Sequence, residues 1–177
     1  MPNLQSSTTV LSTSKPLRVV DIVDGTSVDG PGLRTSIYFA GCAHRCPGCH
    51  NPSTWPADAG RNMTVEELLH HVDVNDFNVT LTGGDPVYQA EALLPLVEGL
   101  KARGKSVWCY TGFTLEELLE EPRAGVKELL GMIDVLVDGP YVEALRDTSL
   151  RFRGSANQRL LNMPATLAAS APVLYGE

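Results

Sequence analysis

The sequence lacks any long apolar run. A membrane-spanning helix needs about 20 consecutive apolar residues, and no segment of this chain of 177 residues reaches that length. Residues 1–16 also lack the apolar core, between a basic start and a small-residue cleavage site, that marks a signal peptide. We therefore expect a cytoplasmic protein without a membrane partner.

Basic residues are in the minority. Lys and Arg total 14 against 21 Asp and Glu, which leaves a formal net charge of -7. An acidic surface repels a phosphate backbone, so we expect no nucleic-acid partner. With 43% hydrophobic and 20% charged residues, the composition is typical of one globular domain with a real hydrophobic core.

Cysteine is scarce and unevenly distributed. Three of the four cysteines lie in GCAHRCPGCHNPSTW, with the spacing Cys42-x3-Cys46-x2-Cys49. Thiols stay reduced in the cytoplasm, so this cluster favours metal binding or redox chemistry over disulfides. No second CxxC or HxxxH follows downstream to supply the separated ligand pair of a usual structural zinc site. A zinc site of the three cysteines with His44 or His50 remains an alternative.

A fourth clustered cysteine is missing. Electron-transfer clusters of the 4Fe-4S type take four cysteine ligands. Three ligands leave one iron open to bind a substrate, which indicates a cluster that does chemistry. The remaining cysteine, Cys109, lies in an apolar strand pattern and is expected to be a small buried side chain.

Strand and helix patterns alternate along the chain. Strands are predicted at residues 34–41, 77–84, 105–112 and 133–139, and helices at residues 63–72, 88–104, 114–121 and 125–131. Thr64 with Glu67, and Thr114 with Glu117, have the spacing of capping boxes that begin helices. This alternation indicates an α/β fold with a parallel sheet, either open or closed into a partial barrel.

Polar and glycine residues follow the four predicted strands, at Gly41-Cys42, residues 82–85, residues 110–112 and residues 138–140. The carboxyl ends of parallel strands share one edge, so these residues are expected to form a single site. We expect a domain over residues 17–163 and a disordered N-terminal extension over residues 1–16. Residues 164–177 are expected to form a loose C-terminal tail, either free or lying over the body of the domain.

The CxxxCxxC loop after the first predicted strand resembles that of the radical S-adenosylmethionine superfamily. VDGPGLR, the cysteine loop and TGGDP are similar to the glycyl-radical-enzyme activases. YTGFTLEEL, IDVLVDGPY and SLRFRGSANQR further resemble the family that activates anaerobic ribonucleoside-triphosphate reductase, and the matches run from about Asp21 to Leu161. Activases of the pyruvate formate-lyase type share the first three motifs but are longer and lack RFRGSANQR; they remain the alternative within this class.

The resemblance implies a partial, open parallel β/α barrel in a minimal version. It implies a 4Fe-4S cluster on Cys42, Cys46 and Cys49, whose open iron binds S-adenosylmethionine. One electron then produces a 5′-deoxyadenosyl radical, which removes a hydrogen atom from a glycine of the large reductase subunit. A flavodoxin-like electron donor is the family expectation. A passive zinc or iron–sulfur interaction module is the alternative from another class of function.

The resemblance also assigns cofactor contacts. Gly83, Gly84 and Asp85 are expected to bind the methionine moiety, with the carboxylate of Asp85 near the ammonium group. Many relatives carry an aromatic residue before the third cysteine, where this chain has Gly48, so His50 becomes the candidate for stacking on the adenine. The remaining candidates are polar residues at strand ends that face the ribose or the methionine carboxylate: Tyr110, Thr111 and Asp138.

Two further segments have alternative interpretations. The turn Asp29-Gly30-Pro31-Gly32 with Arg34 either borders the site or sets the start of the first predicted strand. Arg151, Arg153 and Arg159 stand in an otherwise acidic chain. They either form a solvated face or lie beside the site and dock the reductase.

Overall fold

The computed structural model describes residues 15–176, and the expected N-terminal extension lies almost entirely outside the described residues. A seven-stranded open sheet runs through the molecule in the order β3-β1-β2-β4-β5-β6-β7. The strands are β1 (Leu17–Thr26), β2 (Arg34–Phe39), β3 (Arg61–Met63), β4 (Asn78–Gly83), β5 (Val107–Tyr110), β6 (Val135–Asp138) and β7 (Arg159–Asn162).

The centre of the sheet is parallel and its margins are antiparallel. Strands β2, β4, β5 and β6 are the four that the alternation pattern predicts, and they pair in parallel. Strands β1, β3 and β7 add antiparallel pairs at the two sides. These three strands were not predicted: β3 has three residues, β7 has four, and β1 is largely half-exposed with charged residues along it.

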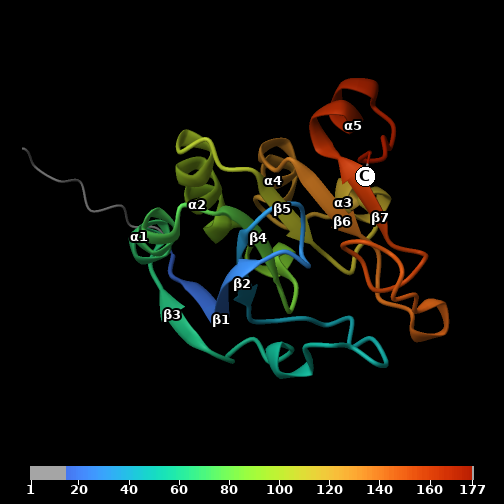
Figure 1. The fold of residues 1–177 in the computed structure, drawn as a ribbon, viewed down its shortest axis with the longest axis horizontal. Helices are drawn as coiled ribbons and strands as arrows, with labels where there is room; N and C mark the ends of the chain where they lie inside the picture. Colours follow the sequence, from blue (N-terminus) through green and yellow to red (C-terminus); the bar gives the residue numbers. More distant parts are fainter. Residues whose placement is uncertain (1–14, 177) are drawn as a thin grey trace, which may run out of the picture.

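Helices cover one face of the sheet (Figure 1). Leu68, Leu96 and Leu129 of three helices pack on Ile37 and Leu81 of the sheet in the main hydrophobic core. Cys109 lies in this core with no exposed surface, as its apolar strand predicts, and burial raises the pKa of its thiol well above the ordinary value. The helices are α1 (Val65–Asn75), α2 (Ala90–Ala102), α3 (Leu115–Glu120), α4 (Val126–Met132) and α5 (Met163–Ala169).

Both predicted capping boxes are present. The Thr64 hydroxyl accepts a hydrogen bond from the backbone N–H of Glu67, whose carboxylate accepts one from the backbone N–H of Thr64. Thr114 and Glu117 repeat the arrangement at α3. The predicted helix at residues 88–104 is also confirmed, because α2 continues through Pro95 and ends before Gly104, which has φ +71°.

The other face of the sheet is covered by loops. A second, smaller core contains Trp108, Val135, Val137 and Leu160, with Phe152 and Tyr175 packed edge-on against Trp108. Phe152 belongs to the segment of residues 139–158, which we call the strap. Helices thus cover one face of the sheet and loops cover the other. The cavity described below lies on the loop-covered face, where residues of the strap line it.

The C-terminal segment is more ordered than the loose tail expected from its small residues. The side chain of Asn162 accepts a hydrogen bond from the N–H of Ala165, and Pro164 occupies the first turn, so α5 begins directly after β7. The chain then returns along β7, where the N–H of Tyr175 donates to the carbonyl of Leu160 over 2.8 Å. None of the helices in residues 15–176 has the length and apolar character of a membrane span.

Candidate cofactor site

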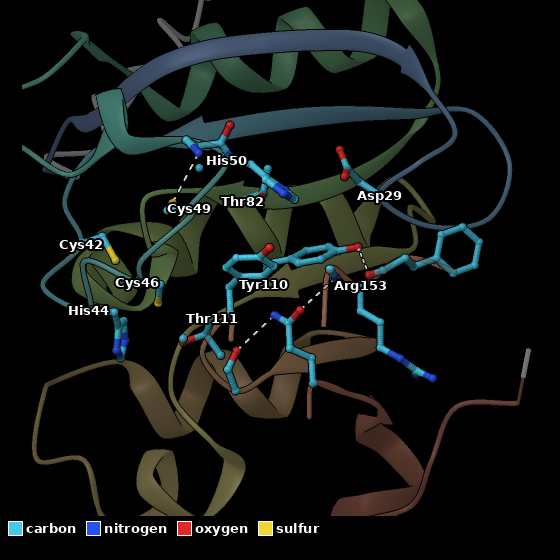
Figure 2. Close-up of a pocket in the computed structure, with 18 of the residues that line it drawn as sticks. Asp29, Cys42, His44, Cys46, Cys49, His50, Thr82, Tyr110, Thr111 and Arg153 are labelled. Atoms are coloured by element: carbon cyan, nitrogen blue, oxygen red, sulfur yellow. Dashed lines mark hydrogen bonds between the residues drawn. The ribbon is translucent and has the colours of Figure 1, made fainter. Parts of the chain in front are cut away.

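The carboxyl ends of the four parallel strands surround one cavity of about 470 Å³, as the strand-end pattern predicts. This volume is within the range of pockets that bind small molecules. Figure 2 shows the three cysteines on one side of the cavity and Asp29 and Arg153 on the other, with Tyr110 between them. The cavity is lined by Cys42, Cys46, Cys49, His50, Gly83, Gly84, Tyr110, Thr111, residues from the strap and others.

The cysteine loop follows β2 directly. The N–H of Gly41 donates to the carbonyl of Thr54 over 2.8 Å, and the N–H of Cys42 donates to the carbonyl of Trp55 over 3.1 Å, so the two ends of the loop are held together. All three thiols are partly accessible. The Sγ of Cys49 accepts a hydrogen bond from the backbone N–H of Asn51.

Partial burial raises the pKa of the Cys42 thiol, and hydrogen bonds from the backbone at His44 and Arg45 oppose that effect. Within residues 15–176, no group of three or more His, Cys, Asp or Glu side chains is placed to hold a single metal ion. The thiols instead stand apart around the loop, and Cys109 lies in the core beneath the helices.

The glycine pair after β4 allows two backbones to approach closely. A Cβ on Gly83 would lie 2.5 Å from the backbone nitrogen of Phe39, and one on Gly84 would lie 2.6 Å from the carbonyl oxygen of Gly41. The N–H of Gly84 donates to the carbonyl of Phe39 over 2.8 Å. The pair therefore lines the cavity and also seats the start of the cysteine loop on β4.

Asp85 lies behind the cavity wall instead of in the cavity. Its side chain is fully buried and accepts hydrogen bonds from the N–H of Val87, the hydroxyl of Thr111 and the N–H of Gly112, over 3.0, 2.9 and 3.0 Å. His44 Nε2 is 3.2 Å from the Oδ2 of Asp85. The Asp85 carboxylate thus faces its own chain, and Asp85 is not among the residues that line the cavity.

Asp138 is also absent from the cavity wall. Its carboxylate accepts hydrogen bonds from the N–H of Leu115 over 2.8 Å and from the Nε of Arg159 over 3.0 Å. Arg159 also donates to Glu116. Asp138 and Arg159 therefore join β6 to β7. The pattern of polar residues at strand ends does not indicate this contact.

The structure brings His50 together with a residue that the sequence did not single out. The rings of His50 and Tyr141 have centroids 5.2 Å apart, and both residues line the cavity. Gly48 has φ +74°, a left-handed conformation that disfavours a residue with a Cβ. This backbone conformation suits the glycine that stands before the third cysteine and disfavours an aromatic residue there.

The two interpretations of the glycine-rich turn apply to different residues. Asp29 lines the cavity and accepts a hydrogen bond of 2.8 Å from the Ser36 hydroxyl, and burial raises the pKa of its carboxyl group. Arg34 is instead completely buried at the start of β2, with its Nε 2.7 Å from the hydroxyl oxygen of Thr80.

The part of the strap around Arg153 lies on the side of the cavity away from the cysteines, whereas Tyr141 near the start of the strap lies against His50. Phe152, Arg153, Gly154 and Gln158 line the cavity, and the hydroxyl of Tyr110 donates to the carbonyl of Phe152 over 2.6 Å. The pattern of strands and helices does not identify this wall, because the strap has no regular secondary structure beyond a short 3-10 turn, Glu143–Leu145. Only the resemblance carried by SLRFRGSANQR points to it.

Comparison with known proteins first defines a class. Residues 28–161 match the family described as a 4Fe-4S single cluster domain. That range includes the three cysteines and every strand end around the cavity. The site described above is therefore the site of a 4Fe-4S domain protein.

The relatives define the family more narrowly. The anaerobic ribonucleoside-triphosphate reductase-activating protein of Escherichia coli K12 is 38% identical over 143 residues, which cover 74% of this chain and 89% of that protein. The proteins of the same name from Vibrio cholerae and Enterobacteria phage T4 are 41% and 40% identical over 141 residues, with 88% and 86% of their lengths covered and 74% and 75% of this chain. The chain belongs to the family of anaerobic ribonucleoside-triphosphate reductase-activating proteins.

A solved structure, QueE from Escherichia coli, is 22% identical, with a TM-score of 0.48 over 56% of this chain and 53% of that one. This similarity is too low to bear on function.

Proposed function

We propose that this protein activates an anaerobic ribonucleoside-triphosphate reductase by installing a glycyl radical in its large subunit, with S-adenosylmethionine as the cofactor. The observation that carries the proposal is the set of three accessible thiols at one cavity formed by parallel strand ends, in a chain of this family. We interpret the open sheet as a short form of the radical S-adenosylmethionine partial barrel, with β2, β4, β5 and β6 as its parallel part.

The residues present fit a cluster with three protein ligands. Cys42, Cys46 and Cys49 are soft donors on one loop, and Cys109 is enclosed in the core on the helix-covered side of the sheet. A 4Fe-4S cluster held there would supply one electron for cleavage of S-adenosylmethionine, and with it the radical chemistry that removes a hydrogen atom from the target glycine. The protein supplies the position of the reactants and the exclusion of water.

The cavity next to the thiols supplies the cofactor contacts that we propose. The backbone of Gly83 and Gly84 lines it and offers hydrogen-bonding groups without side-chain bulk. Tyr110 and Thr111 add polar groups at the end of β5, and His50 with Tyr141 offers aromatic surface for the adenine. Asp85 and Asp138 keep indirect roles, because their carboxylates hold the loops that form the walls.

The side of the cavity formed by the strap and Asp29 is where we place the reductase loop that carries the glycine. Arg153 lines the cavity, and the guanidinium of Arg151 packs 4.9 Å from the ring of Phe152. We propose that these two arginines dock the large subunit of the reductase. We leave Arg159 out of this docking proposal, because its guanidinium pairs with Asp138 and Glu116. A flavodoxin-like cytoplasmic protein is the electron donor that we expect.

The ligand set is tested with four single variants, each with one cysteine replaced by serine. After anaerobic reconstitution, Cys42→Ser, Cys46→Ser and Cys49→Ser are expected to lose the cluster absorption and most of the bound iron and sulfide. Cys109→Ser is the matched control and is expected to keep both. Loss of the cluster at position 109, or one zinc ion per wild-type chain in place of iron and sulfide, contradicts the proposal.

The reaction is tested on the reconstituted wild-type protein. With S-adenosylmethionine and a strong reductant, we expect release of 5′-deoxyadenosine. Addition of the reductase large subunit should then produce the paramagnetic resonance signal of a glycyl radical. A signal with pyruvate formate-lyase but none with the reductase would assign the protein to the other branch of activases.

A further inference from the structure

His44 lies in the sequence between two of the proposed cluster ligands, Cys42 and Cys46. Its side chain contacts other residues and is not one of the proposed ligands. In Figure 2 it lies on the cysteine loop beside Cys46. Its Nε2 is 3.2 Å from the Oδ2 of Asp85, and its imidazole packs edge-on against the ring of Phe113, with centroids 4.5 Å apart. The side chain of His44 is only 19% exposed.

Asp85 is a rigid partner for this contact. It has no exposed surface, and hydrogen bonds from Val87, Thr111 and Gly112 hold both of its oxygens. These donors belong to the loops after β4 and β5. A side chain that contacts the Oδ2 of Asp85 is therefore connected to the ends of two central strands.

The surroundings of His44 are shaped to receive its ring. A Cβ added to Gly112 would lie 2.5 Å from the His44 ring, so only glycine allows the ring this close to the β5 loop. Arg45, the next residue, has φ +47°, a left-handed conformation that residues other than glycine adopt infrequently. The backbone hydrogen bonds from Gly41 and Cys42 hold only the two ends of the loop.

We propose that His44 is a positioning residue: its contact with Asp85 fixes the middle of the cysteine loop against the ends of β4 and β5 and so sets the spacing of the three thiols. This inference rests on the proposed function, because it assigns the thiols to a cluster. His44 itself is not a ligand in this arrangement. Its Nε2 lies at ion-pair distance from Asp85 but is not aligned for a hydrogen bond, so the contact acts together with the packing on Phe113.

Three variants separate the polar contact from the packing. His44→Phe keeps an aromatic ring against Phe113 and Gly112 and removes the polar contact. His44→Gln keeps a side-chain N–H that can reach Asp85. His70→Phe replaces an exposed histidine on α1 and is the matched control.

The measurements use the reconstituted full-length protein. We expect His44→Phe to lose iron to a chelator roughly fivefold faster than the wild type, and the amides of residues 42–50 to exchange roughly fivefold faster, because a polar contact is lost locally. Amides of α1 and β4 should exchange at the wild-type rate. His44→Gln should lie within about twofold of the wild type by both measures, and His70→Phe should be unchanged.

Two results overturn the inference. One is wild-type iron release and loop exchange in His44→Phe. The other is impairment of His44→Gln equal to or greater than that of His44→Phe, which shows that the polar contact does not fix the loop, or faster exchange throughout the protein, which shows a general loss of packing. Amide exchange reports on the loop itself, so it decides the role of His44 even if the wild type fails to cleave S-adenosylmethionine, a failure that would overturn only the proposed function.

Discussion

Arg34 is a charged side chain that the protein buries completely, at the opposite end of β2 from the cysteines. Its Nε donates to the hydroxyl of Thr80, and one Nη donates to the carbonyls of Val79 and Ser106. The guanidinium also lies 5.3 Å from the ring centre of Trp108. Burial lowers its pKa to about 10, so the side chain is still protonated at neutral pH.

Replacement of Arg34 should destabilise the whole domain. Arg34→Met keeps much of the apolar volume but leaves buried acceptors on β4 and before β5 without their donor, which is expected to cost about 2–4 kcal/mol of unfolding free energy. Arg34→Lys should not restore this stability, because an ammonium group lacks the planar fork of donors. Urea unfolding measures both variants.

Arg103→Met is the control for this prediction. Arg103 makes an ion pair with Asp73 over 2.7 Å, but both side chains are well exposed, so its loss should change stability little. Equal unfolding midpoints for Arg34→Met and Arg103→Met would contradict the structural role assigned to Arg34.

Single residues also mark the limit of prediction from sequence. Cys42, Gly83, Gly84 and Thr111 line the predicted cavity, because a residue that closely follows a parallel strand is placed by the strand itself. Cys46 and Cys49 line it through the fold of the loop after β2. Asp85 and Asp138 occupy equivalent sequence positions but turn away from it. Their partners, Gly112 and Arg159, are more than 20 residues distant, and nothing local indicates them.

At the scale of elements, the strap is the part with no local signal. Gln158 holds its base, with Oε1 accepting from the N–H of Gly154 over 2.9 Å and Nε2 donating to the carbonyl of Gly139 over 3.2 Å. Tyr110 fixes its far part through the 2.6 Å hydrogen bond to Phe152. Burial raises the pKa of the Tyr110 hydroxyl well above its ordinary value, so this donor keeps its proton over the working pH range.

Tyr110→Phe should loosen the strap without disturbing the sheet. The variant keeps the ring and loses one buried hydrogen bond, so we expect amide exchange in residues 145–154 to be roughly fivefold faster, with β4 and β5 unchanged. Tyr175→Phe, which keeps its ring against Trp108, is the control. Unchanged exchange in the strap of Tyr110→Phe would show that the strap is held by other contacts.

The helices differ from the strap, because the residues that begin them can be recognised in the local sequence. Thr64 and Thr114 begin α1 and α3 as their capping boxes predict. Asn162 and Pro164 provide a similar signal for α5, although the small residues around them suggested a loose tail. The order of the tail also depends on its pairing with β7, a contact that composition does not reveal.

At the scale of the molecule, the two faces of the sheet differ in chemistry. Helices seal the apolar face, whereas the face beneath the loops carries the cavity and the partly buried carboxyl group of Asp29. Burial raises the pKa of Asp29 above its ordinary value of 3.8, and the Ser36 hydrogen bond and the charge of Arg34 only partly oppose this. The charged form of Asp29 is therefore unfavourable in the folded state.

This pKa shift predicts a pH dependence of global stability. A folded-state pKa above the unfolded one means that the folded protein binds the proton more tightly, so the stabilising contribution is complete below pH 3.8 and is lost as the pH rises through the folded pKa. Asp29→Asn has no carboxyl group at this position, so the variant does not lose this contribution to stability as the pH rises. Its stability relative to the wild type should therefore increase from pH 4 to pH 7 in urea unfolding of the cluster-free protein.

Asp147→Asn should behave in the opposite way. Hydrogen bonds from Ser149 lower the pKa of the exposed Asp147, so the wild type gains stability as the pH rises. The stability of Asp147→Asn relative to the wild type should therefore decrease over the same pH range. The same pH trend in both variants would contradict the assignment of the Asp29 shift to burial.

The sequence by itself determined the parallel strands, the helix starts, the class of cofactor chemistry and the edge of the sheet at which the site lies. These features depend on periodicity, caps and the order of residues at strand ends, all of which are local. The tertiary structure alone decided that Asp85 and Asp138 bond to the loops around the cavity, that the strap lines the cavity and that His44 lies close to Asp85. Each of these contacts joins residues at least 20 positions apart, and only the packing of the complete sheet brings such residues together.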